Sequence, residues 1–499
     1  MAFSSGWLAG AVVIFSHRRA AGCCASVDPA RRPPSAPTGS PTVTGACLAA
    51  RTAPCLGCRC AVLMRISARG HPVVFPDGFL WGSATAAHQV EGNNVASDFW
   101  ALEHAAVSRF AEPSGDACDH YRLYRRDLAL LRDLGFTSYR FSIEWARVEP
   151  EDGAFSRAAI AHYRDVLEAC REFGIIPMVT LHHFTSPRWL MKLGGWEYEG
   201  TPERFAAYCR LVMSELGPLI PYVATINEAN IASLTRRMIE DVTGVKPGPA
   251  SAEQAPVGVG TLQTEGAGDW RTAGADALGT TPENLNLFLF TWSDRGLAVV
   301  KRAHVEARRV IKEVSPSTQV GLTLALQDMQ SEAGGEKAAA ERWAEVFDDY
   351  LSAMDGDDFL GVQNYSRVLV DADGAAFHPE GAELTQMGYE FYPQALENVL
   401  RRAAAAGLPM IVTENGIGTD DDNRRTDFIR LALVGVERCL ADGVDVRGYY
   451  YWSALDNFEW MLGYRPTFGL IAVDRSTQQR HVKDSARYLG SIARRNALR

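Results

Sequence analysis

The strongest constraint in this sequence is an alternation that begins near Phe75 and continues to the end of the chain. Short β-rich runs alternate with longer stretches whose apolar residues recur at helical spacing. Such alternation implies parallel strands joined by crossover helices. The eight predicted strands are residues 79–85, 138–145, 175–184, 222–227, 319–326, 359–365, 410–415 and 448–455.

The stretches between these runs predict amphipathic helices. In residues 121–134, for example, Leu128 and Leu131 lie on one apolar stripe. Several of the stretches are followed by a glycine, as a left-handed helix C-cap requires: Gly135, Gly174, Gly217, Gly407 and Gly443. The other predicted helices are residues 158–173, 202–216, 284–314, 343–354, 393–406, 427–442 and a last one near 483–495.

Eight strand–helix units are the number that closes a (β/α)8 barrel. We therefore predict an α/β protein with a single TIM barrel and long βα loops, formed by residues 71–499. The chief alternative is an open doubly wound sheet. In that fold a glycine-rich phosphate-binding loop follows the first strand. Residues 81–85, where the first predicted strand ends, contain too few glycines for such a loop.

One stretch breaks the alternation. Residues 236–283 are rich in Gly, Ala and Thr and show no sustained apolar period. We interpret them as a long loop after the fourth strand, on the face where barrel sites are built. A loop of this length is expected to form a rim element or to be partly disordered.

The first 70 residues differ from the rest of the chain. They hold eight Arg, no Lys and a single acid, Asp28. The apolar run 7–15 has no basic segment before it and a basic segment after it, which is the wrong order for a secretory signal. A transit peptide fits slightly better, but we favour a disordered leader or a start codon misassigned upstream of Met64.

The remaining chain is acidic, with 42 Lys+Arg (50 − 8) against 59 Asp+Glu (60 − 1), or about −17. This charge argues against nucleic acid or an anionic membrane surface as a partner. No run of 18 apolar residues is present to span a membrane. Cysteines beyond the leader are scattered singly, as in a reducing compartment, so a cytoplasmic location is predicted: Cys118, Cys170, Cys209 and Cys439.

Polar residues are concentrated where the predicted strands end, and two glutamates stand out among them. Glu228 and Glu414 each end a β-rich, otherwise uncharged run and each lies beside an Asn. The fourth and seventh strands face each other across a barrel, so both carboxylates can point at one substrate. Glycoside hydrolysis needs such a pair, one protonated and one ionised. Arg140 is a candidate cation to keep one of them ionised.

Other strand-end residues allow two interpretations. His182 and His183 are either a satisfied core pair or metal ligands, and without a third ligand nearby we predict no metal site. Trp452 and Trp460 could belong to the core, but beside Glu459 they are better placed to stack on a sugar ring. Asp328 is interpreted as structural.

The motifs at these positions resemble glycoside hydrolase family 1 over about residues 75–495. The resemblance rests on FPDGFLWGSATAAHQVEG (75–92), YRFSIEWAR (139–147), TLHHF (180–184), TINE (225–228), TENG (413–416) and YWSALDNFEW (451–460). It implies a retaining, cofactor-free exo-β-glycosidase acting on small-molecule β-glycosides, typically glucosides and also galactosides or fucosides.

The resemblance also implies a role for each matched residue. Glu228 corresponds to the acid/base and Glu414 to the nucleophile, which Arg140 and Tyr365 would hold and polarise. A carboxylate at Glu459 suits sugar hydroxyls and would repel a phosphate, which resembles the glucosidase branch of the family. The implied sugar-binding set is Gln89, His183, Asn227, Trp452, Glu459 and Trp460.

Some positions depart from the family pattern. Ala229 stands where Pro is usual, Gln363 where Asn is usual and Phe184 where Trp is usual, and residues 236–283 replace a Gly/Tyr-rich stretch. No catalytic group is lost, so the departures bear on the leaving-group side. Two further readings stay open: a transglycosylase with the same intermediate, and an idle sugar-binding barrel, which would be expected to lack one of the glutamates.

Overall fold

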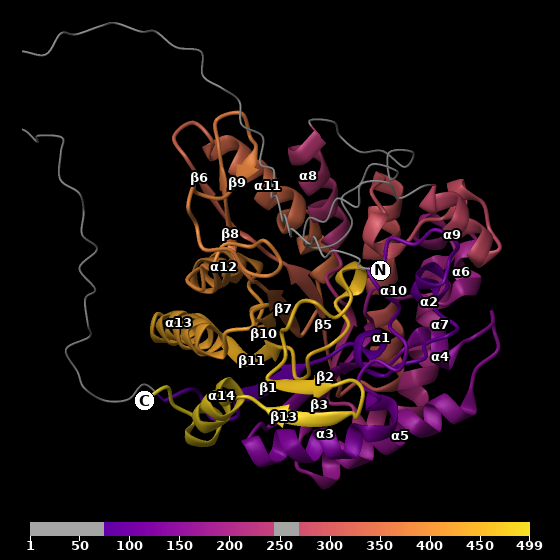
Figure 1. Cartoon of the computed structure of the whole chain (residues 1–499), viewed down its shortest axis with the longest axis horizontal. Helices are drawn as coiled ribbons and strands as arrows, with labels where there is room; N and C mark the ends of the chain where they lie inside the picture. The colour runs from indigo at the N-terminus through magenta and orange to yellow at the C-terminus, as the bar shows by residue number, and fades with distance from the viewer. Residues whose placement is uncertain (1–73, 244–268) are drawn as a thin grey trace, which may run out of the picture. The chain divides into compact units, whose positions relative to one another are not determined.

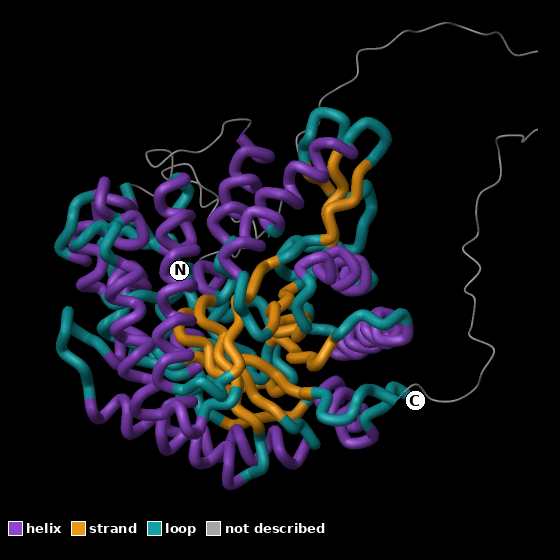
Figure 2. Tube along the Cα trace, turned by 180° about the vertical axis from the view of Figure 1, so that it is seen from behind, coloured by secondary structure: helices purple, strands orange, loops and turns teal. Residues whose placement is uncertain are grey.

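The computed structural model describes residues 74–243 and 269–499. Eight parallel strands close into a barrel, because β1 pairs with both β2 and β11. Helices surround this barrel (Figures 1 and 2). The prediction of a (β/α)8 barrel is confirmed, and the open doubly wound sheet is wrong. The strands are β1 (Leu80–Ala84), β2 (Ser138–Ser142), β3 (Ile176–His182), β4 (Tyr222–Ile226), β5 (Gln319–Ala325), β7 (Phe359–Gln363), β10 (Met410–Asn415) and β11 (Val446–Trp452).

Long helices follow the barrel strands. These are α3 (His120–Leu134), α5 (Arg157–Glu172), α7 (Thr201–Leu216), α10 (Asp294–Val314), α11 (Glu336–Val346), α12 (Ala395–Ala403), α13 (Asp422–Ala441) and α14 (Asp484–Arg495). Further helices lie in the loops: α1 (Ala87–Val90), α2 (Asp98–Glu103), α4 (Trp145–Val148), α6 (Arg188–Lys192), α8 (Ile231–Thr243) and α9 (Trp270–Leu278). In the part of the chain that the structure describes, no helix has the length and apolarity to span a bilayer.

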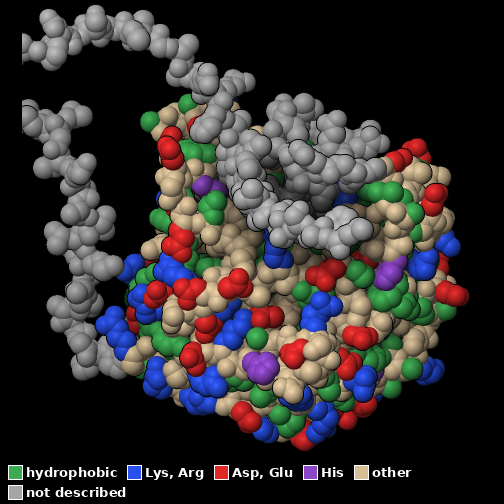
Figure 3. All heavy atoms as spheres, in the orientation of Figure 1, with side chains coloured by type: hydrophobic (Ala, Val, Ile, Leu, Met, Phe, Trp, Pro, Cys, Tyr) green, Lys and Arg blue, Asp and Glu red, His purple; other side chains and the backbone are tan. Residues whose placement is uncertain are grey.

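Additional strands form two small sheets outside the barrel. One contains β6 (Asp328–Ser331), β8 (Arg367–Val370) and β9 (Ala376–Phe377), and the other pairs β12 (Ile471–Asp474) with β13 (Gln479–Val482). Acidic and basic side chains are interspersed over the described surface seen in Figure 3. The predicted leader, residues 1–70, lies outside the described residues.

Three helix predictions were wrong at their boundaries. The predicted helix 427–442 begins five residues earlier, at Asp422, where the Asp421 side chain caps it. The predicted helix 284–314 begins ten residues later, at Asp294, because the Ser293 side chain caps it by accepting from the Gly296 N–H. The predicted helix 343–354 is two elements: α11 starts at Glu336 and ends at Val346, and the 3-10 helix η6 (Asp348–Met354) follows.

The predicted glycine C-caps are confirmed at four positions, where φ lies between 68° and 99°: Gly135, Gly174, Gly407 and Gly443. Gly217 is the exception, with a right-handed φ of −49°. There the chain continues from α7 into the short 3-10 helix η2 (Gly217–Leu219), so no reversal is needed at the glycine.

The interpretation of residues 236–283 as one long loop was also wrong in part. Helix α8 extends through Thr243, and α9 occupies Trp270–Leu278, where Asp269 caps the helix by accepting from the Thr272 N–H. In α9, Gly274 lets the helix approach Leu102 of α2, because a Cβ there would lie 2.6 Å from the Leu102 Cδ2. Small residues, which looked like loop composition, here permit close helix packing. Residues 244–268 of this stretch lie outside the described part.

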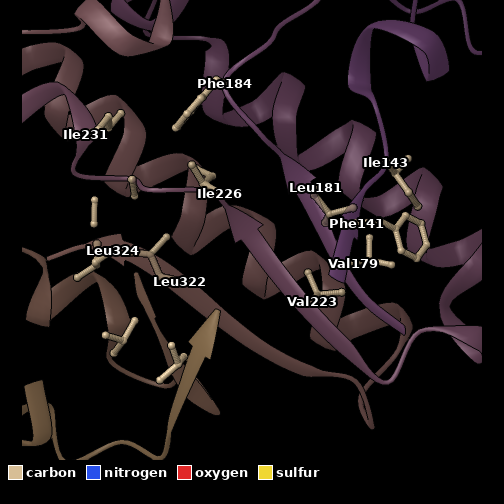
Figure 4. Close-up of a cluster of buried hydrophobic side chains, with 14 of the residues drawn as sticks. Phe141, Ile143, Val179, Leu181, Phe184, Val223, Ile226, Ile231, Leu322 and Leu324 are labelled. Carbon is tan, nitrogen blue, oxygen red and sulfur yellow. The ribbon is translucent and has the colours of Figure 1, made fainter. Parts of the chain in front are cut away.

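The barrel wall separates two hydrophobic clusters, as the alternation of side chains along a strand requires. The inner cluster includes Leu80, Met178, Phe359, Ile411 and Tyr450. Their immediate neighbours along each strand point outward into a larger cluster between the strands and the helices. Figure 4 shows part of that outer layer, with side chains from β2 to β5 lying together: Phe141, Val179, Leu181, Val223, Leu322 and Leu324.

Inside the barrel, glycines make room for the large inner rings. A Cβ on Gly82 would lie 2.4 Å from the Tyr450 ring, and one on Gly321 would lie 2.3 Å from the Phe359 backbone oxygen. The large side chains of some strands therefore fill the lower barrel, and glycines on the neighbouring strands leave the space that these side chains need. This packed layer forms a floor, and the strand ends above it are left for polar side chains.

We expect Leu322→Ala to lower the free energy of unfolding by about 2–5 kcal/mol, because Leu322 is fully buried and the change leaves a cavity in the outer layer. Urea denaturation would measure the effect. The matched control is Leu384→Ala, at a side chain that is 40% exposed, for which a change within about 0.5 kcal/mol is expected. Equal effects of the two variants would contradict this assignment of the core.

Candidate active site

A cavity of about 520 Å³, its open mouth included, lies at the carboxyl ends of the barrel strands. Both glutamates singled out in the sequence reach it, although they come from strands separated by β5 and β7 in the barrel. The lining residues are His183, Phe184, Asn227, Glu228, Tyr365, Met387, Tyr389, Glu414, Trp452, Glu459, Trp460, Leu462 and Phe468.

Glu414 reaches this cavity because of an irregularity in β10. Val412 pairs with Val362 of β7, yet Glu414, two residues further, pairs with Gln363, only one residue further. The extra residue, Thr413, is a bulge that turns Glu414 to the same side as Gln363. Without it, Glu414 would share the outward face of Val412, since side chains alternate along a strand.

Arg140 on β2 binds Glu414 from inside the barrel. Its Nη1 donates to Glu414 Oε1 at 2.6 Å, in a pair whose side chains are 0% and 4% exposed. The remaining guanidinium donors are also used: Nε binds Thr180 Oγ1 at 3.0 Å and Nη2 binds Asn227 Oδ1 at 2.5 Å. Tyr365 completes the set by donating its hydroxyl to Glu414 Oε2 at 2.6 Å.

These contacts oppose the effect of burial on the pKa of Glu414. Burial raises the pKa of this carboxyl above its ordinary value, while the Arg140 cation and the Tyr365 hydroxyl act in the opposite direction. Both of its oxygens thus accept hydrogen bonds that favour the ionised form. Of the two carboxyls in this pair, Glu414 is the one whose surroundings supply a cation in direct contact.

Glu228 lies in a different environment. Its backbone has a left-handed φ of 45°, and its N–H donates to Thr323 Oγ1 at 3.0 Å. Among the described residues, no hydrogen bond to its carboxyl is found. Burial, and next the negative charge of Glu414, raise the pKa of Glu228 well above its ordinary value. Glu228 is therefore the carboxyl that keeps its proton when Glu414 has lost one.

A third carboxyl, Glu459, lies in the same cavity. Its Oε2 accepts from Asn457 Nδ2 at 3.0 Å and from Gln89 Nε2 at 3.3 Å. Burial chiefly raises the pKa of Glu459 to about 8, with a further contribution from the charge of Glu414. Gln89 is thereby placed beside the cavity although it does not line it. Its buried Oε1 has no partner in the described structure.

The aromatic residues form one wall of the cavity. His183 stacks on Trp452 with ring centroids 5.5 Å apart and lies 6.1 Å from Trp460. Two of the wall residues, Phe184 and Trp460, have left-handed backbones with φ of 69° and 51°. Such conformations are strained for bulky residues and cluster at functional sites.

Asn227 presents a free donor to the cavity. Its Oδ1 accepts from both Arg140 and Gln363, whose Nε2 lies 2.8 Å away. The amide is thereby fixed with Nδ2 directed elsewhere, and in the described chain that buried Nδ2 has no partner. The same holds for His183 Nδ1. Buried polar atoms without a partner at one cavity are what a polyhydroxylated ligand would satisfy.

The structure thus brings every predicted site residue to or beside one cavity, and it separates others from it. His182 points away and packs against Trp196 and Phe288 at 4.7 Å. Asp328 on the small sheet accepts from Gln330 of the same strand and from Asn398 of α12. Within residues 74–243 and 269–499, no cluster of three or more His, Cys, Asp or Glu side chains suits a metal ion.

Several lining residues were missed by sequence reasoning: Met387, Tyr389, Leu462 and Phe468. Met387 and Tyr389 come from the connection between β9 and α12, Leu462 ends the 3-10 helix η8 (Trp460–Leu462), and Phe468 lies in the connection after it. None of them ends a predicted strand, and spacing gives no signal for where a long loop folds back. Tyr389 adds a buried hydroxyl for which the described residues provide no partner.

Comparisons with known proteins agree with this geometry. The family model described as glycosyl hydrolase family 1 matches residues 71–252 and 347–498. β-Glucosidase A of Acetivibrio thermocellus is 29% identical over 85% of this chain and 99% of its own length. A bifunctional β-D-glucosidase/β-D-fucosidase of Bifidobacterium breve is 32% identical over 83% of this chain and 96% of its own length.

Solved structures give the same result. The crystal structure of a β-glycosidase is 51% identical, with a TM-score of 0.78 over 85% of this chain and 98% of its own. A β-glucosidase from Thermotoga maritima in complex with glucoimidazole is 25% identical, with a TM-score of 0.70 over 85% of this chain and all of its own. From the sequence match and the barrel together, the chain belongs to glycosyl hydrolase family 1.

Proposed function

We propose that the protein is a retaining exo-β-glycosidase that hydrolyses terminal, non-reducing β-D-glucosides through a covalent glycosyl-enzyme. The observation that carries the proposal is the pair of buried carboxyls in one cavity, of which only Glu414 contacts a cation. Retaining glycosidases need one ionised and one protonated carboxyl beside the scissile bond. The cation beside Glu414 favours its ionised form, whereas burial and the charge of Glu414 favour the protonated form of Glu228.

In the first step, a Glu414 oxygen attacks the anomeric carbon and forms a C–O bond to the sugar. The glycosidic C–O bond breaks, and Glu228 gives its proton to the departing oxygen, which leaves as an alcohol. Arg140 and Tyr365 hold the Glu414 carboxylate for attack through the two hydrogen bonds to its oxygens.

In the second step, the Glu228 carboxylate takes a proton from water, whose oxygen attacks the anomeric carbon. The bond to Glu414 breaks and returns its electron pair to the carboxylate. Two displacements at one carbon leave its configuration unchanged. Glu228 regains its proton, so both carboxyls end the cycle as they began it.

The sugar would be held by the polar and aromatic residues around these carboxyls. Glu459 supports an unphosphorylated sugar, because a carboxyl offers a phosphate no positive charge and no Lys or Arg is among the described residues that line the cavity. The Bifidobacterium relative named as a glucosidase and fucosidase supports tolerance of galactosides or fucosides as well. The proposed sugar-binding set is Gln89, His183, Asn227, Trp452, Glu459 and Trp460.

The same intermediate would serve a transglycosylase, in which a sugar hydroxyl replaces water in the second step. Product analysis with added cellobiose separates the two, because only transglycosylation yields longer oligosaccharides. The idle-barrel reading is disfavoured, since both glutamates are present in one cavity with their supporting residues.

We also propose a cytoplasmic location. The cysteines of the described residues, Cys118, Cys170, Cys209 and Cys439, are all buried and free. Buried single thiols are typical of a reducing compartment.

We expect Glu414→Ala to abolish hydrolysis of p-nitrophenyl β-glucoside, by at least about 10⁴-fold in kcat, because no covalent intermediate can form. Added azide should restore turnover by attacking directly, giving the α-glucosyl azide. The release of nitrophenol and the configuration of the azide by NMR would be measured. Wild type with azide is the control. Absence of rescue, or a β-azide product from Glu414→Ala, would count against Glu414 as nucleophile.

The raised pKa of Glu228 predicts the alkaline side of the pH profile. Activity needs this carboxyl protonated, so kcat/KM should fall as pH rises through its raised pKa. In Glu228→Gln this alkaline fall should vanish for a dinitrophenyl glucoside, which needs no proton to leave. With cellobiose, turnover should drop about 10²–10⁴-fold.

The matched control is Glu151→Gln, at an exposed glutamate outside the cavity, which should keep the wild-type profile. Should the alkaline fall persist unchanged in Glu228→Gln, another group must be the acid.

A further inference from the structure

Trp460 contacts two aromatic rings outside the cavity, in addition to His183 and Phe184, which line it. Its backbone φ of 51° is costly for a bulky side chain and persists only where the surroundings impose it. The His88 ring lies behind the indole, nearly parallel to it, with centroids 5.9 Å apart and an angle of 11°. The Phe99 ring meets the indole edge-on at 5.4 Å and 88°. Neither His88 nor Phe99 lines the cavity.

His88 is in turn fixed by Glu103. Its Nε2 lies 2.7 Å from Glu103 Oε1, and both side chains are completely buried. The other Glu103 oxygen accepts from the N–H and the hydroxyl of Ser114, at 2.9 and 2.8 Å. Burial alone would raise the pKa of Glu103, but His88 and Ser114 outweigh it and lower the pKa. An ionised carboxylate only accepts, so His88 Nε2 carries the proton.

Phe99, which contacts Trp460, and Glu103, which holds His88, both come from the short helix α2. Phe99 and Glu103 lie four residues apart on α2 and hence on the same face. The helix itself is anchored to the loop after β3, which carries His183 and Phe184. Asp98 exchanges two hydrogen bonds with Ser186: its N–H donates to the Ser186 oxygen at 2.9 Å and its Oδ1 accepts from the Ser186 N–H at 3.0 Å. One helix therefore contacts both strained segments of the aromatic wall.

We propose that Glu103 and His88 are positioning residues for the glycosidase reaction: Glu103 fixes the plane of the His88 imidazole, and that ring sets the orientation of Trp460 toward the sugar. The proposal rests on the proposed function, because it assigns Trp460 a contact with substrate. Neither Glu103 nor His88 touches the cavity, so each acts through Trp460.

The physical reason is the cost of a buried donor without an acceptor. Removing the Glu103 carboxylate leaves the Nε2–H of the buried His88 ring without an acceptor, so the ring is driven to turn toward another partner. Trp460 then loses its parallel support, and its indole can relax from the left-handed backbone. Displacements of about 1 Å at a sugar-binding group are enough to slow catalysis substantially.

The test is a double-mutant cycle between Glu103→Ala and Trp460→Phe, with kcat and KM measured on p-nitrophenyl β-glucoside. In the presence of Trp460, Glu103→Ala should lower kcat/KM about tenfold. In the Trp460→Phe background the same change should cost less than about twofold. Glu103→Gln, which keeps the side-chain length and a hydrogen-bonding group, should lose less than Glu103→Ala.

A matched control is Glu197→Ala. Glu197 is also a buried carboxylate, held by Ser293 at 2.6 Å and Arg295 at 3.2 Å, and it does not line the cavity. Its loss should lower the Tm and leave kcat/KM unchanged. If Glu103→Ala fails to fold, the cycle is run with Glu103→Gln, which is expected to give a coupling of the same sign and smaller size.

Equal losses from the Glu103 change in both backgrounds, or no loss in either, would overturn the positioning role. That result is distinct from failure of the proposed function. If wild type turns over no β-glycoside, the glycosidase proposal itself fails, whereas turnover by wild type with an uncoupled Glu103 removes only this inference.

Discussion

The ion pair between Arg140 and Glu414 is the interaction on which the rest of the site depends. A guanidinium inside a barrel loses its hydration, and this loss is compensated only if its donors find acceptors. Arg140 finds them on β3, on β10 and just after β4. Those acceptors fix Glu414 and Asn227 together, and Asn227 immediately precedes Glu228. The charge that stabilises one carboxylate thus also sets the position of the segment that carries the other.

This dependence explains why the floor of the barrel is apolar and its top is polar. Leu80, Met178, Phe359, Ile411 and Tyr450 fill the lower interior and exclude water beneath Arg140. Low polarity under the ion pair strengthens it and also raises the pKa values of Glu228 and Glu459. The apolar packing of the lower barrel and the raised pKa values of Glu228 and Glu459 above it therefore both follow from the exclusion of water from the barrel interior.

Much of the fold could be predicted because its signals are local. Each barrel strand is a run of apolar or β-branched residues, and each was recognised within a few residues of its ends. The two glutamates and their partners lie in contiguous motifs at strand ends, which is why the sequence could indicate them. The boundaries of α10 and α11 were missed because a serine cap and a 3-10 segment interrupt an apolar pattern that continues past them.

What could not be predicted depends on contacts between distant segments. Tyr389 reaches the cavity from a loop, and no local pattern shows where that loop turns. Residues 270–278 looked like a loop because of their glycine and alanines, yet they form α9, in which Gly274 allows close packing against Leu102. The pairing of Glu103 with His88 behind Trp460 joins residues from three separate segments of the chain.

The bulge at Thr413 has a consequence for how this strand can change over evolutionary time. In a regular strand, residues an even number apart share a face, so Glu414 faces inward only because the bulge at Thr413 shifts this odd–even parity by one residue. Substitutions preserve this parity, while insertion or deletion of a single residue reverses it for everything downstream. We therefore expect the six residues of β10, Glu414 excepted, to tolerate substitution far better than any change of length.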